Sequence, residues 1–244
     1  MRQRRRPYLA LGTAVVLSMS GCSFSSGAGG AGASSSSGTK SGVTASPTAA
    51  AVYQLMRKSG AAATSVHVTG DYTDKGQPLR LDVAGDRGGQ TMRLLVDFGS
   101  GPIEILMVDG DFYLKAGGTF WTRLESAAVA RVAADRYVKV PPGSAAGMGD
   151  FRVGILLDQV FSEHLPGLDE LNATTQTSDV DGVPAYLLTS KVAGAAKIYV
   201  SADGRARLLR TEGARTGALR FTEWSSVEPI SPPAQDQQAV VPNV

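Results

Sequence analysis

The sequence of 244 residues contains one cysteine, two histidines and few aromatic residues, which make up 7 % of the chain. A single cysteine excludes an internal disulfide and any zinc or iron–sulfur site that needs several cysteines. The two histidines, His67 and His164, are too few for a histidine metal cluster, so we expect no metal site and no cofactor. Acidic residues are absent before Asp71, whereas four of the first six residues are arginines.

The chain also lacks an excess of charge of one sign. Once residues 1–21 are set aside, 20 basic and 22 acidic residues remain. Binding to nucleic acid needs a concentrated positive field, so we expect no nucleic-acid partner. Hydrophobic residues make up 43 % of the chain, which is too many for a disordered protein and too few for a polytopic membrane protein.

The N-terminus has the features of an export signal. A basic start is followed by an apolar run, Leu9 to Met19, that is too short to span a bilayer. The small residues Ser18-Met19-Ser20-Gly21 then precede Cys22, an order that resembles the lipobox of bacterial lipoproteins, although Leu is commoner than Met at its first position. The resemblance implies a lipoprotein signal peptide over 1–21. It also implies that Cys22 carries lipid such as palmitate and anchors the protein to the extracytoplasmic face of the cell membrane.

The route of export stays open between two alternatives. The segment Arg5-Arg6-Pro7-Tyr8-Leu9 looks like a twin-arginine signal, which a receptor reads. An ordinary basic start of a signal peptide is the other alternative.

Two segments lack periodic apolar residues. Ser and Gly make up more than half of residues 22–46, which predicts a flexible tether because such a segment buries too little apolar surface to fold. Residues 229–244 contain four prolines and little periodicity, so we expect a disordered tail over 231–244.

The remaining residues, 47–230, are predicted to form one β-rich domain. Ser46 is expected as the N-cap of a first helix that starts at Pro47 and ends at Gly60. Alternating apolar residues then predict strands, and two alanine- or leucine-rich stretches predict helices. The strands are expected near 79–83, 92–98, 103–107, 112–114, 173–180, 185–191, 197–201, 207–212 and 218–224, and the helices over 127–134 and 151–165. The predicted fold is mainly antiparallel β with short helices: a curled half-barrel sheet of about ten to eleven strands with helices packed on its concave face.

The order of these elements is similar to that of the LolA/LppX-type bacterial lipoproteins, including the LprG-like lipoproteins of actinobacteria. The most similar motifs are Val180 to Ala185, Ile198 to Gly204 and Phe221 to Trp224. The resemblance covers about residues 48–230 and implies a half-barrel with an apolar cavity for lipid acyl chains. It implies lipid or glycolipid binding and lipid transport in the cell envelope.

Candidate residues for such a cavity are mid-sized apolar side chains on the expected inner face of the sheet and on the helix 151–165. They are Val83, Leu94, Val96, Ile105, Met107, Leu114, Leu156, Val160 and Phe161. The same residues could instead pack a dry core, because amphipathic stripes commonly do so. The first interpretation predicts a lipid carrier, and the second a ligand-free surface interaction or structural lipoprotein; in both cases we expect a monomer.

Motifs of known enzymes are missing, so we expect no catalytic activity. His67 lies in an alternating strand and is expected to face solvent. Four aspartates flank a glycine at an expected turn: Asp109, Asp111, Asp179 and Asp181. Aspartate is favoured at turns because its side chain forms hydrogen bonds with the nearby backbone. The arginines 205, 207, 210, 215 and 220 could meet anionic lipid headgroups or lie on a solvated face of the sheet.

Overall fold

The computed structural model describes residues 46–74, 77–97, 99, 101–141, 152–213 and 217–241. These residues belong to one compact unit, Thr44–Val244. The expected signal peptide, Cys22 and nearly all of the expected tether lie outside the described residues. No helix of the described part of the chain is long and apolar enough to span a bilayer.

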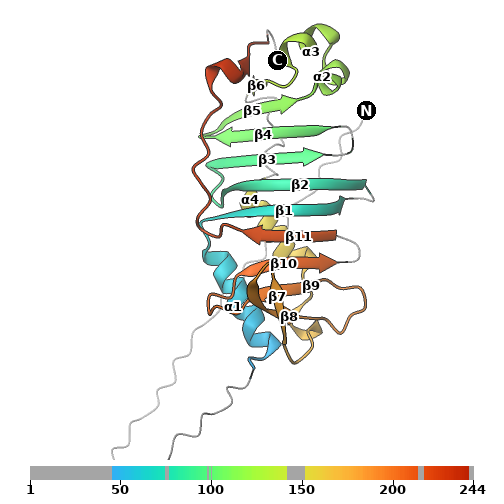
Figure 1. Ribbon diagram of the computed structural model, residues 1–244, viewed down its shortest axis with the longest axis vertical. Coiled ribbons are helices and arrows are strands. Elements are labelled where there is room, and N and C mark those ends of the chain that lie inside the picture. Colours follow the sequence, from blue (N-terminus) through green and yellow to red (C-terminus); the bar gives the residue numbers. More distant parts are fainter. Residues whose placement is uncertain are drawn as a thin grey trace, which may run out of the picture. The chain divides into compact units, whose positions relative to one another are not determined.

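Within the described residues, twelve strands form one open, curled sheet that is accompanied by short helices, which confirms the predicted half-barrel fold (Figure 1). The strands are β1 (Ser65–Asp74), β2 (Gln77–Asp86), β3 (Thr91–Asp97), β4 (Pro102–Val108), β5 (Asp111–Ala116), β6 (Tyr137–Val140), β7 (Gln176–Val180), β8 (Val183–Leu188), β9 (Lys197–Ser201), β10 (Leu208–Gly213), β11 (Gly217–Thr222) and β12 (Gln238–Ala239). The helices are α1 (Ala49–Ala62), α2 (Gly118–Leu124), α3 (Ala127–Ala133), α4 (Val153–Gln159), the π-helix η2 (Val160–His164), and the 3₁₀ turns η3 (Leu168–Glu170) and η4 (Gln235–Gln237).

The sheet consists of two meanders joined side by side. Its order is β12-β6-β5-β4-β3-β2-β1-β11-β10-β9-β8-β7, so β1 pairs with β11 at the seam between the two halves. Among the strands that the structure describes, every pairing is antiparallel except that of β12 with β6. The seam joins residues about 150 positions apart in the sequence, since His67 lies opposite Thr222.

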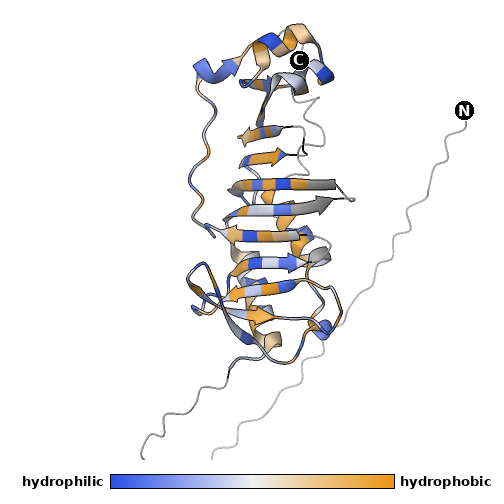
Figure 2. Cartoon of the chain, turned by 45° about the vertical axis from the view of Figure 1, so that its right-hand side comes forward, coloured by the Kyte–Doolittle hydropathy of each residue, from blue (hydrophilic) through white to orange (hydrophobic). Residues whose placement is uncertain are grey.

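The core lies on one face of the sheet, as the alternation of the strands predicts. On β3, Met92, Leu94 and Val96 are buried, whereas Arg93 points to the opposite, outer face. Figure 2 shows hydrophobic and hydrophilic residues alternating along the strands. Helix α1 packs against β8 and α4 against β2, while α2 and α3 pack on each other after β5. One continuous apolar cluster therefore runs between the sheet and these helices.

Two details of the helices differ from the prediction. Helix α1 starts at Ala49 and its N-cap is Thr48, whose Oγ1 accepts a hydrogen bond from Ala51 N at 3.2 Å. Pro47 lies outside the helix because Thr48 is held extended by a β-bridge to Thr174. The sequence pattern also assigns no helix to α2, since its Thr, Phe and Trp residues are typical of strands.

The prediction of a disordered tail over 231–244 is wrong for its described part. We call residues 225–237 the strap: they run along the outer face from the end of β11 to β6 (Figure 1). Beyond the strap, β12 pairs with β6 and Ala239 is only 6 % exposed. The prolines exclude regular helix and strand from residues 225–234 of the strap, and the 3₁₀ turn η4 follows them. They do not prevent it from packing, because its apolar side chains find partners on the folded sheet.

Candidate functional site

A straight row of apolar side chains crosses the inner face of the sheet. Directly opposed residues of seven neighbouring strands form this inner row: Phe221, Val68, Val83, Leu94, Ile105, Leu114 and Val138. All seven are buried. With strands about 4.8 Å apart, the inner row is about 30 Å long. Four of the predicted cavity residues belong to it, so the structure brings these four into one line.

The other five predicted cavity residues lie beside the inner row or opposite it. Val96 and Met107 are buried on the inner face of β3 and β4. Val160 and Phe161 are buried in η2, and Leu156 of α4 is partly buried against the same cluster. All nine residues therefore share one apolar layer, which is compatible with a lipid cavity and with a packed core.

The helix that faces β2 changes its geometry halfway. Helix α4 continues directly into the π-helix η2, a rare form that is frequent at functional sites. Phe161 of η2 lies so close to α1 that a Cβ atom at Gly60 would be 2.6 Å from its ring. A side chain at position 60 would therefore require the Phe161 ring to shift.

A surface pocket of about 480 Å³ lies where η2 meets α1. Its walls include Tyr53, Phe161 and Leu165, which are also members of the inner apolar cluster. Arg57 lies at this pocket with its guanidinium 5.9 Å from the ring centre of Tyr53 and 5.7 Å from that of Phe161. Its Nη1 donates a hydrogen bond of 2.8 Å to the carbonyl oxygen of Phe161. The inner apolar layer thus reaches the surface beside a fixed cation.

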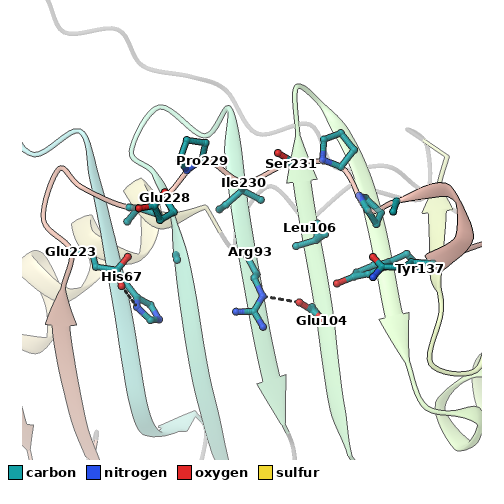
Figure 3. Close-up of a pocket in the computed structure, with 16 residues that line it drawn as sticks. His67, Arg93, Glu104, Leu106, Tyr137, Glu223, Glu228, Pro229, Ile230 and Ser231 are labelled. Atoms are coloured by element: carbon teal, nitrogen blue, oxygen red, sulfur yellow. Dashed lines mark hydrogen bonds and ion pairs between the residues drawn. The ribbon is translucent and has the colours of Figure 1, made fainter.

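A second pocket, of about 530 Å³, lies on the outer face beneath the strap (Figure 3). Ile230 of the strap packs on a small apolar cluster of Leu106, Tyr113 and Tyr137. The two ends of the strap are bonded to the domain: Val227 N donates to Ser65 Oγ, and Arg136 Nη2 donates to the carbonyl oxygens of Asp236 and Gln238. The strap consequently bridges the pocket from its two fixed ends.

The floor of this second pocket is polar, and its titratable side chains contact one another. His67 Nε2 is 2.9 Å from Asp82 Oδ1, and its Nδ1 is 3.3 Å from Glu223 Oε1. Arg93 Nε donates a hydrogen bond of 2.7 Å to Glu104 Oε1, which raises the pKa of the guanidinium (Figure 3). Burial, together with the nearby charge of Glu104, raises the pKa of Tyr137 to about 12. These polar side chains therefore contact one another across neighbouring strands of the outer face.

His67 lies on the outer face, as expected, but it is held between two carboxylates rather than simply facing solvent. Its partners are 15 and 156 residues away in the sequence, so alternation within β1 gives no sign of them. The side chain of His164 lies outside the described residues.

The four aspartates that the sequence assigns to glycine turns do lie at or beside turns in the structure. Asp179 Oδ1 accepts a hydrogen bond from Gly182 N at 2.7 Å, and Asp109 and Asp181 have φ angles of 50° and 54°. Asp111 forms an ion pair with Lys139. The described residues contain no group of three or more histidine, cysteine or acidic side chains that could hold a metal ion.

The arginines of the C-terminal strands are largely paired with neighbouring acids. Arg210 lies 2.7 Å from Glu212, and Arg220 lies 2.6 Å from Asp181. Arg205 is 4.0 Å from Asp203, whereas Arg215 is outside the described residues. These pairs favour the interpretation of a solvated sheet face over that of a headgroup site.

Trp121 of α2 has an unexpected environment that the sequence does not reveal. The residue is 1 % exposed, and within the described part of the chain its Nε1 has no hydrogen-bond partner. Buried indole N–H groups usually have an acceptor. Sequence patterns predict burial but not the absence of a partner, so no local signal could have identified this group.

Comparison with known proteins adds only distant likenesses. No protein-family model and no curated protein matches the chain. Among solved structures, the chain is similar to LprF from Mycobacterium bovis, with 14 % identity and a TM-score of 0.45 over 76 % of this chain and 95 % of that one. It is also similar to an uncharacterized conserved protein from Thermus thermophilus, with 12 % identity and a TM-score of 0.34 over 78 % and 96 % of the two chains.

Proposed function

We propose that the protein is a membrane-anchored lipoprotein of the cell envelope that binds lipid acyl chains along the inner row. The observation that supports this most directly is the inner row itself, an unbroken apolar line across seven strands under a cover of short helices. Helix α4 and its continuation η2 together have 12 residues and are therefore about 17 Å long, a little over half of the inner row. A short helix can be displaced without dismantling the sheet.

Binding is driven by the hydrophobic effect. Each methylene of an acyl chain that leaves water contributes about 0.8 kcal/mol. When α4 and η2 move outward, Leu156, Val160 and Phe161 lose contacts with the core. The free energy gained by burying an acyl chain along the inner row would offset this loss. The pocket between η2 and α1 is the natural place for entry, because core residues already reach the surface there.

The anchor in this proposal is lipidated Cys22. The residues from 22 to 46 would then connect the anchor to the folded unit. Replacing Cys22 with Ser should move the protein from the membrane fraction to the soluble fraction of the cell envelope. A protein that stays membrane-bound after this change has another anchor, and the proposed lipidation is then wrong.

Two neighbouring residues of β3 offer a matched test of acyl-chain binding. Val96 lies on the inner face and is 6 % exposed, whereas Leu95 lies on the outer face and is partly exposed. In Val96→Trp the larger ring would fill the space of the ligand, so lipid that co-purifies with the protein should decrease several-fold. In Leu95→Trp the amount of lipid should not change. Mass spectrometry of lipid extracted from gently purified protein measures the amount.

The alternative, a ligand-free interaction or structural lipoprotein, makes different predictions. The parent protein would then contain no lipid, and Val96→Trp would overpack a dry core and lower the free energy of unfolding by about 1–3 kcal/mol. Equal lipid content in the two variants would also contradict binding along the inner row. A urea titration of each variant separates loss of lipid from loss of folding.

A further inference from the structure

The chain has two tryptophans, and both are buried, but their indole groups differ. Trp224 Nε1 donates a hydrogen bond of 2.8 Å to the carbonyl oxygen of Leu208. Trp121 Nε1 has no acceptor among the described residues. A buried donor without a partner loses its hydration and gains nothing in exchange, so such groups are rare in folded proteins. The difference calls for an acceptor that is not part of the described chain.

Trp121 lies at one end of the proposed lipid site. Helix α2 follows β5 after a single residue, Gly117, and β5 contributes Leu114 to the inner row. Trp121 belongs to the same apolar cluster as the row. Its neighbour Phe120 stands edge-on to it, with ring centres 5.4 Å apart, and packs partly buried against the same cluster.

We infer that Trp121 Nε1 donates a hydrogen bond to an oxygen of the bound lipid, and that the ligand is an acyl ester. This inference rests on the proposed function. An indole N–H is a donor only, so its partner must be an acceptor. The surrounding cluster is apolar, and a charged carboxylate there would lose its hydration without a counter-charge. An uncharged ester carbonyl meets both conditions, because it accepts a hydrogen bond and carries no charge. The N–H group of Trp121 would then make esters bind more tightly than plain hydrocarbons.

The two tryptophans supply a matched pair of variants. Trp121→Phe keeps an aromatic ring and removes only the donor and part of the ring volume. Trp224→Phe makes the same chemical change at a donor that already has an acceptor within the protein. A purely structural role for Trp121 predicts similar effects of both changes on ligand binding, whereas a donor role predicts an effect of Trp121→Phe alone.

The experiment compares methyl laurate with an unbranched alkane of equal heavy-atom count. Residues 22–244 with Cys22→Ser are used because they contain the whole compact unit Thr44–Val244. Affinities are measured by competition with a fluorescent acyl probe. The parent should bind the ester about tenfold more tightly than the alkane, which corresponds to about 1.4 kcal/mol. The preference should disappear in Trp121→Phe and persist in Trp224→Phe.

A direct measurement keeps the test independent of how well the variants fold. The indole N–H groups give two resonances in a ¹H–¹⁵N spectrum, and Trp224→Phe identifies that of Trp121. The ester should move the Trp121 proton resonance downfield, as hydrogen bonding does, and the alkane should not.

The outcomes separate this inference from the proposed function. Equal affinity for the two ligands, or an unchanged Trp121 resonance with bound ester, would refute the donor role and leave acyl-chain binding intact. A protein that binds neither ligand would refute both.

Discussion

The seam between the two halves of the sheet depends on one glycine, and its replacement gives a sharp prediction. Gly70 lies in β1 opposite Leu219 of β11. Its φ angle of 155° would direct a side chain at this position along the sheet rather than away from it, so that a Cβ atom would be 2.0 Å from the carbonyl oxygen of Ala218. It would also lie 3.0 Å from the carbonyl carbon of Ala218 and 3.1 Å from the Cα of Leu219. All three atoms belong to the backbone, so no side-chain rotation can relieve the contact.

The loss of stability in Gly70→Ala follows from the distance by which β11 must move away from β1. An ordinary contact between a carbon atom and a neighbour is about 3.5 Å, so the seam must open locally by more than about 1 Å in Gly70→Ala. Hydrogen bonds on either side of the seam would then be lengthened. If about three of them are lost, at about 1 kcal/mol each, the free energy of unfolding falls by about 3 kcal/mol. That is a large part of the roughly 5–15 kcal/mol typical of a domain.

Urea unfolding measures this loss. With a slope of about 2–3 kcal/mol per molar, the midpoint for Gly70→Ala should fall by about 1–1.5 M. Gly118→Ala is the control, because its Cβ would meet only the Cβ of Ala134 at an ordinary distance of 3.6 Å and the position is the first of helix α2. Its midpoint should stay unchanged or rise slightly. A Gly70→Ala midpoint equal to that of the parent would refute the close approach at the seam.

Two further predictions concern the outer face. Because the pKa of Tyr137 is raised to about 12, its proton is retained in the folded state above pH 10, where the unfolded chain releases it. Stability should therefore fall between pH 10 and 12 by at most about 3 kcal/mol, and Glu104→Gln should lower the pKa in an absorbance titration. Ile230→Ala should cost about 1–2 kcal/mol and speed protease cleavage in the strap, since Ile230 packs on Leu106 and the two tyrosines. Val240→Ala, at a side chain that is 88 % exposed, should change neither.

The strands were accessible to sequence analysis because their signal is local. In β3, Met92, Leu94 and Val96 alternate with polar or outer-face residues, and the structure buries these three. The same alternation placed six of the cavity candidates on the inner side of the sheet, and the pattern of the helix 151–165 placed the other three opposite them. What alternation does not decide is whether such a layer admits a ligand, because cavity linings and dry cores use the same residue types.

The strap and helix α2 show where local patterns fail. The strap has no period, so its sequence resembles that of a disordered tail, yet Ile230 and Ala239 are packed on the sheet. Helix α2 contains residues with a preference for strands and is helical because Trp121 and its neighbours pack into the core. In both cases tertiary contacts outweigh the local preference of the chain.

The sequence by itself determined where most of the strands lie and which side of each of these is apolar, because both follow from a period of two along the chain. Only the tertiary structure decided which strands meet. The pairing of β1 with β11, the position of His67 between Asp82 and Glu223, and the path of the strap all join residues far apart in sequence. The burial of Trp121 Nε1 without a hydrogen-bond partner among the described residues was likewise decided only by the tertiary structure. The physical reason is that burial along one strand is a local property, whereas pairing and hydrogen-bond satisfaction depend on every element that packs around it.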